Sequence, residues 1–225
     1  IYTKEELIEL FSVDRMKKSN ARYDQRKLDY INSKHIRNIG VEKLVDHVFN
    51  WAENLVLKNF IADQYDESEG WELELKTDVN KYLPLWKKDI EYFKKALSLE
   101  FERITYLAEL PKALNFFYDE ELNWIDEDWN TKNHEKKELA KGLEGILPLL
   151  EELFKDSKKV THEEWENVVR NYADEIGWKH GDLFLAIRSA STGRLKSPPL
   201  LESFEVMGWE KVKKFITQAI DWLNK

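Results

Sequence analysis

Apolar residues recur at helical spacing along most of the 225-residue chain. The clearest stripe comprises Val41, Leu44, Val45, Val48, Phe49, Ala52, Leu55 and Val56. This spacing places the apolar side chains on one face of an α-helix. Similar stripes run from Trp86 to Leu107, before Pro111, and from Val212 to Leu223. Since no segment alternates polar and apolar residues as a half-buried strand does, the pattern predicts an all-α fold.

Several short motifs predict where these helices begin and end. Thr3 with Glu6 and Thr161 with Glu164 have the spacing of a capping box at a helix start. Gly177 follows another apolar stripe, as a C-terminal cap does. In contrast, the polar stretch 63–84 predicts the main loop or domain junction, and the acidic stretch 119–130 predicts a linker.

The stretch from Gly181 to Gly208 predicts two short helices joined by a polar turn. Its apolar run ends at Arg188, so residues 189–193 are predicted as a loop. Ser197 fits an N-cap, and the two prolines after it fit the first turn of the second helix, which Gly208 would end. Spacing alone is compatible with a corner of a helical domain or with a recognition site.

Composition and charge limit the classes of function. The chain is 42% hydrophobic and 13% aromatic, which supports a folded core, and it has no cysteine for disulfides or thiolate metal sites. Five scattered histidines show no paired-ligand spacing, so we expect no metal site. No apolar run is long enough to span a membrane, and we expect a cytoplasmic protein.

The net charge of −8 is unusual for a protein that binds a polyanion, but the charge is segregated. Residues 14–37 contain eight Lys and Arg against three Asp, whereas residues 119–128 contain six acidic residues and no basic one. Such segregation can steer a polyanion to one face. The alternative is that both stretches are merely solvated surfaces.

Two blocks of the sequence resemble bacterial-type glutamyl-tRNA synthetases. Residues 183–220, LFLAIRSASTGRLKSPPLLESFEVMGWEKVKKFITQAI, resemble that family's anticodon-binding end, where the pattern reads L-F-x-x-[LI]-R-x-A-x-T-G followed by [ST]-P-x-L-x-E-x-x-x-x-x-G. Residues 6–37 resemble the stretch just past the family's catalytic domain. The resemblance implies the tRNA-binding portion of a class I aminoacyl-tRNA synthetase.

The family's nucleotide-binding half, with its HIGH-like and KMSKS-like motifs, has no counterpart in the chain. RMKKS at Arg15 to Ser19 resembles KMSKS, but in the family that loop lies upstream of the helices with which this sequence begins. We therefore expect no catalytic residue and no cofactor here, with ATP and Mg belonging to the missing catalytic domain. The chain alone is expected to be inactive in ATP-dependent aminoacylation.

The resemblance also implies roles for individual residues. Arg188 matches a base-contacting arginine, since a guanidinium can hydrogen-bond a base edge or stack on it. Arg103 matches a position where arginine reads the third anticodon base and disfavours the glutamine tRNA. The expected anticodon-binding set is Arg188, Arg103, Ser197, Pro198, Leu200 and Thr192. Contacts to the tRNA backbone are expected from Lys17, Lys18 and Arg22. The alternatives are a surface ion pair for Arg188 and plain solvent exposure for the basic trio.

These observations predict an all-α chain with three parts: a stem-contacting region at 1–70 and two anticodon-binding helical domains at 71–125 and 126–225. The expected partner is the glutamate tRNA, with no DNA and no membrane, and we expect a monomer. Two alternatives stay open, namely the anticodon-binding domain of a class I lysyl-type synthetase and a helical protein-docking module.

Overall fold

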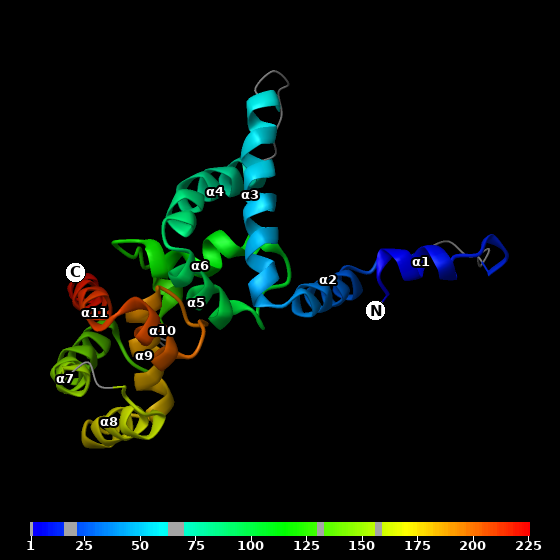
Figure 1. Ribbon diagram of the computed structural model, residues 1–225. Helices are drawn as coiled ribbons and strands as arrows, with labels where there is room; N and C mark the ends of the chain where they lie inside the picture. The colour runs from blue at the N-terminus through cyan, green and yellow to red at the C-terminus, as the bar shows by residue number, and fades with distance from the viewer. Residues whose placement is uncertain (1, 16–21, 63–69, 130–132, 156–158) are drawn as a thin grey trace. The chain divides into compact units, whose positions relative to one another are not determined.

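The computed structural model describes residues 2–15, 22–62, 70–129, 133–155 and 159–225. Within these ranges the chain forms eleven α-helices and no strand, which confirms the all-α prediction (Figure 1). The helices are α1 (Lys4–Leu10), α2 (Gln25–Ile39), α3 (Val41–Ala62), α4 (Gly70–Lys88), α5 (Ile90–Glu100), α6 (Leu110–Tyr118), α7 (Lys136–Phe154), α8 (His162–Glu175), α9 (His180–Thr192), α10 (Leu200–Met207) and α11 (Trp209–Leu223).

Helix ends follow the capping signals in most places. The Thr161 hydroxyl accepts a hydrogen bond from the Glu164 amide at 3.2 Å, and the Glu164 carboxylate accepts one from the Thr161 amide at 2.9 Å. Thr3 and Glu6 form the same reciprocal box before α1. Gly208 ends α10 with φ at 81°, a value that costs glycine little. Both capping boxes and this glycine cap are therefore confirmed.

Helix α4 corrects the loop predicted at 63–84. Residues 63–69 lie outside the described ranges, but residues 70–84 belong to α4. Val79, Tyr82, Leu83 and Trp86 are buried, and their spacing places them on one helix face. The prediction was wrong because charged residues surround this stripe and Pro84 lies inside the helix, where proline normally interrupts the backbone hydrogen bonds.

A break at Asp89 corrects the continuous helix predicted from Trp86 to Leu107. Helix α4 ends at Lys88, and α5 runs only from Ile90 to Glu100. The Asp89 carboxylate accepts a hydrogen bond from the Tyr92 amide at 2.9 Å, as an N-cap side chain does. Residues 101–106 are irregular, so Arg103 lies in a turn and not on a helix.

The chain divides into two compact units, the first comprising residues 1–83 and 101–111 and the second residues 84–100 and 112–225. The three-part division predicted from the sequence stays a prediction. In the first unit, Arg37 joins α2 to the irregular segment after α5, because its Nη1 donates to the Ile104 carbonyl at 2.6 Å. Its Nε also lies 3.5 Å from the Glu102 carboxylate. Leu44 and Val48 of α3 are completely buried.

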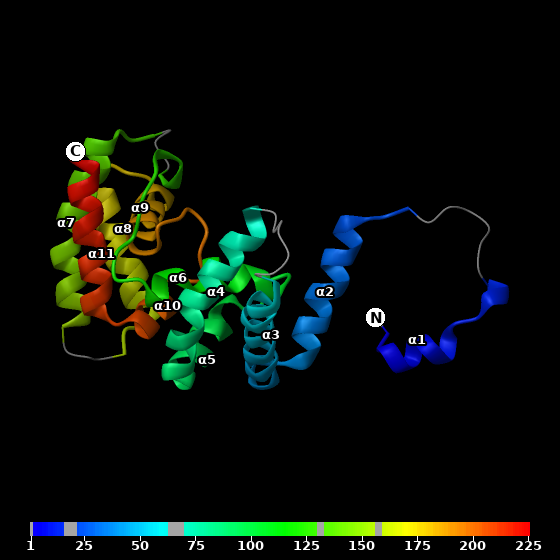
Figure 2. The ribbon, with the colours of Figure 1, turned by 90° about the horizontal axis from the view of Figure 1, so that it is seen from above.

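In the second unit, α7, α8, α9 and α11 run side by side, and α11 packs most extensively on α7 and α9 (Figure 2). Helix α10 packs on α5 and α11. The buried side chains at the centre include Leu143, Ile146, Leu150, Val169, Leu183, Ile187, Val212, Phe215, Ile216 and Ala219. Burying each large aliphatic or aromatic side chain contributes about 1.5–3 kcal/mol, so this core fixes where the ends of α9 and α10 lie. In the described ranges, none of the helices combines the length and hydropathy that crossing a bilayer requires.

Candidate nucleic-acid interface

The α9–α10 hairpin, residues 180–207, brings most of the predicted anticodon-binding residues together. Arg188 projects from α9, and its Nη1 donates to the carbonyls of Ser197 at 2.9 Å and Pro198 at 2.8 Å. It also donates to the Ser197 hydroxyl. The Thr192 hydroxyl donates to the Arg188 carbonyl at 2.8 Å, which fixes the last turn of α9. Arg188 therefore holds the loop against the helix that precedes it.

The end of α9 differs from the sequence prediction. The helix continues through Ser189 and Ser191 to Thr192, and Gly193 ends it with φ at 69°. The predicted loop at 189–193 is therefore wrong except at Gly193. The hydroxyls of Ser191 and Thr192 donate to carbonyls one turn earlier, at 2.7 and 2.8 Å, so these polar residues stay helical while buried.

The N-cap predicted at Ser197 is also wrong. The cap residue of α10 is Pro199, which has no side-chain cap, and α10 begins at Leu200. The Ser197 hydroxyl instead accepts from Arg188 and donates to the Pro198 carbonyl at 3.1 Å. Thr192, Ser197 and Leu200 are at most 6% exposed, so these three side chains support the loop from beneath. Pro199 lies on the surface of the same loop.

A second arginine, Arg194, holds the other side of the loop and was missed by the sequence analysis. Its Nη2 donates to the Lys112 carbonyl at 2.7 Å and to the Asn115 side-chain oxygen, both on α6. Its guanidinium carbon lies 5.1 Å from the centre of the Phe116 ring, within the range of a cation–π contact. The only signal in the sequence was its place next to the turn glycine, since its partners are about eighty residues away.

The acidic stretch predicted as a linker is described over residues 119–129, and it is attached to α9 through Trp124 and the Asp128 backbone. Trp124 is 8% exposed, and its indole nitrogen donates to the Ser189 carbonyl at 2.8 Å. The Ser189 hydroxyl donates to the Asp128 carbonyl at 2.6 Å. Arg188 thus joins the loop to α9, while Arg194 and Ser189 connect the loop and α9 to α6 and to the acidic stretch. The loop is therefore preorganised before any ligand binds.

The C-terminal end of α6 is stabilised by a partly buried polar cluster. The Phe117 carbonyl accepts hydrogen bonds from the Tyr92 hydroxyl and the Lys211 ammonium, each at 2.8 Å. Burial, and secondarily the charge of Asp89, raises the pKa of Tyr92 to about 12. Burial lowers the pKa of the Lys211 ammonium, although nearby acidic residues oppose this shift. These groups fix the helix on which Arg194 rests.

The other predicted contact residues lie elsewhere. Arg103 is exposed on the irregular segment of the first unit and is not part of the hairpin. Arg22 is exposed just before Asp24, the N-cap of α2. Lys17 and Lys18 lie outside the described residues. Among the residues that are described, no group of three or more His, Asp or Glu is placed to hold a metal ion.

Comparison with known proteins adds to this geometry. The family model described as anticodon binding domain matches residues 74–220, well over half of the chain. The chain belongs to the anticodon binding domain family. The matched range contains the whole α9–α10 hairpin and Arg103, whereas Arg22 and the two lysines before it lie outside it.

Curated relatives of this anticodon binding domain are glutamate–tRNA ligases. That of Borreliella burgdorferi is 31% identical over 99% of this chain and 40% of the relative. Glutamate–tRNA ligase 1 of Caldicellulosiruptor saccharolyticus is 27% identical over 100% of this chain and 40% of the relative. The resemblance inferred from the sequence is therefore confirmed, and the chain spans about 40% of the length of these relatives.

The fold is shared with a solved structure of a glutamate tRNA ligase from Elizabethkingia meningosepticum in complex with its amino acid. The TM-score is 0.56 at 18% identity, and the match covers 97% of this chain and 36% of that chain. A second structure, from Elizabethkingia anophelis, gives a TM-score of 0.56 at 17% identity over 96% of this chain and 36% of that one. At these identities the likeness shows the fold.

Proposed function

We propose that this anticodon binding domain is the tRNA-binding part of a glutamate–tRNA ligase, and that its α9–α10 hairpin binds the anticodon loop of the glutamate tRNA. The whole enzyme would carry out ATP-dependent aminoacylation in the cytoplasm as a monomer. This chain would contribute binding and no catalytic residue, with ATP and Mg bound elsewhere in the enzyme.

The observation that carries this proposal is the bonding of Arg188 to the Ser197–Pro198 backbone. The two halves of the sequence pattern, Arg188 to Gly193 and Ser197 to Gly208, are thereby joined into one preorganised structure. Proteins read single-stranded RNA by splaying its bases onto shaped surfaces with aromatic rings or guanidinium planes. The half-buried Arg188 guanidinium, held in place near the exposed Pro199, provides such a surface without an ordering cost on binding.

Arg103 is proposed to act on the third anticodon base. It is exposed, and its segment is held by the hydrogen bond from Arg37 to the Ile104 carbonyl, so its backbone has a defined position within the first unit. An arginine there would disfavour the glutamine tRNA. Arg103→Gln is expected to narrow the difference in binding constant between the glutamate and glutamine tRNAs, measured at one salt concentration; an unchanged difference would remove Arg103 from the recognition set.

The proposed function is tested by nuclease footprinting of the glutamate tRNA with the purified chain. Protection of the anticodon loop is expected, because the bases must be held out of the stacked loop for the hairpin to read them. A chain with Lys141→Ala, an exposed change on α7 outside the hairpin, serves as a control and should retain the footprint. Binding that leaves the anticodon loop as accessible as in free tRNA would contradict the proposal.

A further inference from the structure

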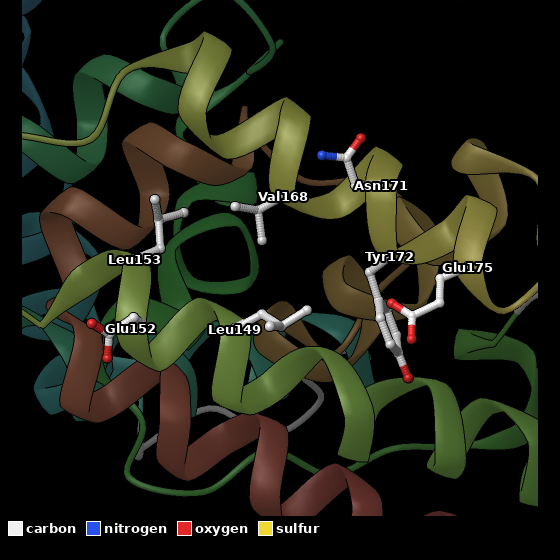
Figure 3. A pocket seen from close by; sticks show the side chains of 7 residues that line it. All are labelled: Leu149, Glu152, Leu153, Val168, Asn171, Tyr172 and Glu175. Atoms are coloured by element: carbon white, nitrogen blue, oxygen red, sulfur yellow. The ribbon is translucent and has the colours of Figure 1, made fainter.

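A hollow of about 420 Å³ lies between α7 and α8 (Figure 3), and none of the residues assigned to RNA lines it. Its lining is Leu149, Glu152 and Leu153 of α7 with Val168, Asn171, Tyr172 and Glu175 of α8. Figure 3 shows the leucines and the valine pointing toward the space between the helices, with carboxylates on both sides. We call this feature the α7–α8 groove.

The groove has an apolar floor because each helix contributes an incompletely covered stripe. On α8 the lining residues are spaced by three, one and three positions, which places them on one helix face. On α7, Leu149 and Leu153 are four residues apart, and Leu149 is 42% exposed. The floor is therefore open to solvent. A small ligand would remain largely uncovered here, whereas small-molecule pockets enclose most of their ligand.

Tyr172 gives the groove a fixed wall. Its ring lies against the α7 backbone at Gly145, since a Cβ at that position would be 1.7 Å from the tyrosine hydroxyl. Beyond it lies a second hollow of about 250 Å³, lined in part by Tyr172, Gly142 and Trp178. A Cβ at Gly142 would likewise lie 2.6 Å from Trp178. Two glycines in a helix interior each cost about 1 kcal/mol relative to alanine, and here they admit the aromatic rings.

Carboxylates flank the apolar floor on both helices. Glu152 of α7 and Glu175 of α8 are exposed. Glu152 lies 3.3 Å from the Lys155 ammonium, but both side chains are mostly exposed, and such a pair contributes little and is readily exchanged. Glu175 lines the groove together with Tyr172, and burial, followed by the charge of this carboxylate, raises the pKa of Tyr172. The surroundings favour cations next to apolar groups.

We propose that the α7–α8 groove docks an amphipathic helix of a partner protein, whose apolar residues enter the groove while its Lys or Arg residues pair with Glu152 and Glu175. An apolar seam between two helices is the usual receptor for such a helix, which inserts residues at i, i+3, i+4 and i+7. Flanking carboxylates select a basic helix and set its orientation.

The charges argue against two other occupants. RNA phosphates would be repelled by Glu152 and Glu175, and the lining of the groove has no Lys or Arg to compensate. A second copy of the chain, docked about a two-fold axis, would bring the same carboxylates against each other in a protein with a net charge of −8. The docking proposal also goes beyond the proposed function, because none of the groove residues belongs to the α9–α10 hairpin.

The probe is a synthetic helical peptide with leucines at i, i+3, i+4 and i+7 and lysines flanking them, titrated into the ¹⁵N-labelled 225-residue chain. Saturable shifts are expected at the amides of the groove residues, with affinity measured by fluorescence anisotropy. One control peptide keeps the lysines but replaces the leucines by serine, and another keeps the leucines but replaces the lysines by glutamate. Both should bind at least about tenfold more weakly.

Protein variants separate docking from general attraction to an acidic protein. The affinity for the leucine–lysine peptide should fall about tenfold in Leu149→Lys, and also about tenfold in the double variant Glu152→Gln with Glu175→Gln. It should not fall in Asp221→Lys, an exposed change on α11. Leu149 is exposed enough that its replacement should leave the melting temperature nearly unchanged. The proposal would be overturned by equal affinity for all three peptides or by amide chemical-shift changes outside the groove. It would also be overturned if RNA shifted the groove amides, or if the chain self-associated and Leu149→Lys abolished that self-association.

Discussion

Replacing Arg188 by alanine should destabilise the second unit as well as weaken RNA binding. The side chain joins α9 to the loop before α10 through the carbonyls of Ser197 and Pro198. Removing it leaves those acceptors without their charged donor and removes the link between the helix and the loop. The stability effect distinguishes an arginine that builds the recognition surface from one that merely lies on it.

The expected size follows from the bonding. Nη1 carries two hydrogens, so of its three close acceptors it can serve two fully at a time. A hydrogen bond from a charged donor contributes about 1.5–3 kcal/mol. Because Arg188 is only half-buried and water can replace part of this bonding, a loss of about 2–4 kcal/mol in the free energy of unfolding is expected.

The assay is thermal unfolding followed by circular dichroism at neutral pH. For a chain of this size each kcal/mol lowers the melting temperature by about 2–4 °C, so a decrease of roughly 4–16 °C is expected. Arg188→Lys should lie between wild type and alanine, since an ammonium keeps the charge but loses the planar fork. Lys196→Ala, exposed on the same loop, should change the free energy by less than about 0.5 kcal/mol. A melting temperature for Arg188→Ala equal to that of Lys196→Ala would refute the reasoning.

Three further predictions concern other parts of the chain. Thr161→Ala should cost about 1 kcal/mol in urea unfolding through loss of the α8 cap, while Thr161→Ser should be nearly neutral, and an equal loss for both would contradict the cap. Because folding raises the pKa of Tyr92 to about 12 from the usual tyrosine value of 10.0, the unfolded protein releases that proton first. The stability contributed by Tyr92 should be complete below pH ~10 and decline toward pH ~12, and Tyr92→Phe should flatten that decline in urea titrations. Neutralising Lys17, Lys18 and Arg22 together should weaken binding to all tRNAs alike and flatten its salt dependence; an unchanged slope would show that they do not contact phosphates.

The helices with regular stripes could be predicted from the sequence because local spacing determines which face is buried. The Val212–Leu223 stripe became α11, and the Thr161–Glu164 capping box begins α8. Helix α4 was missed because its stripe is short and surrounded by charge, with Pro84 inside it. That segment is helical because Val79 and Trp86 are buried in the folded protein, and local composition does not show such burial.

Most residues of the candidate site could be predicted from the sequence, but their hydrogen-bond partners could not. The helical spacing of apolar residues ends at Arg188, yet α9 continues to Thr192. It continues because the hydroxyls of Ser191 and Thr192 donate hydrogen bonds to backbone carbonyls of the preceding turn. Ser197 looked like a cap, but Arg188 is its partner. The anchoring of Arg194 to α6 depends on a contact between residues far apart in the chain, and a single sequence carries no sign of it.

The most direct test of anticodon recognition is a set of binding constants at one salt concentration, well below the melting temperature of every variant. Wild type and Arg188→Ala are compared on the glutamate tRNA and on the same tRNA with a changed anticodon. The account predicts that wild type prefers the cognate anticodon. It also predicts that Arg188→Ala loses about 1–3 kcal/mol on the cognate tRNA and much less on the changed one. Equal affinity of wild type for both tRNAs, with equal losses in the variant, would contradict it.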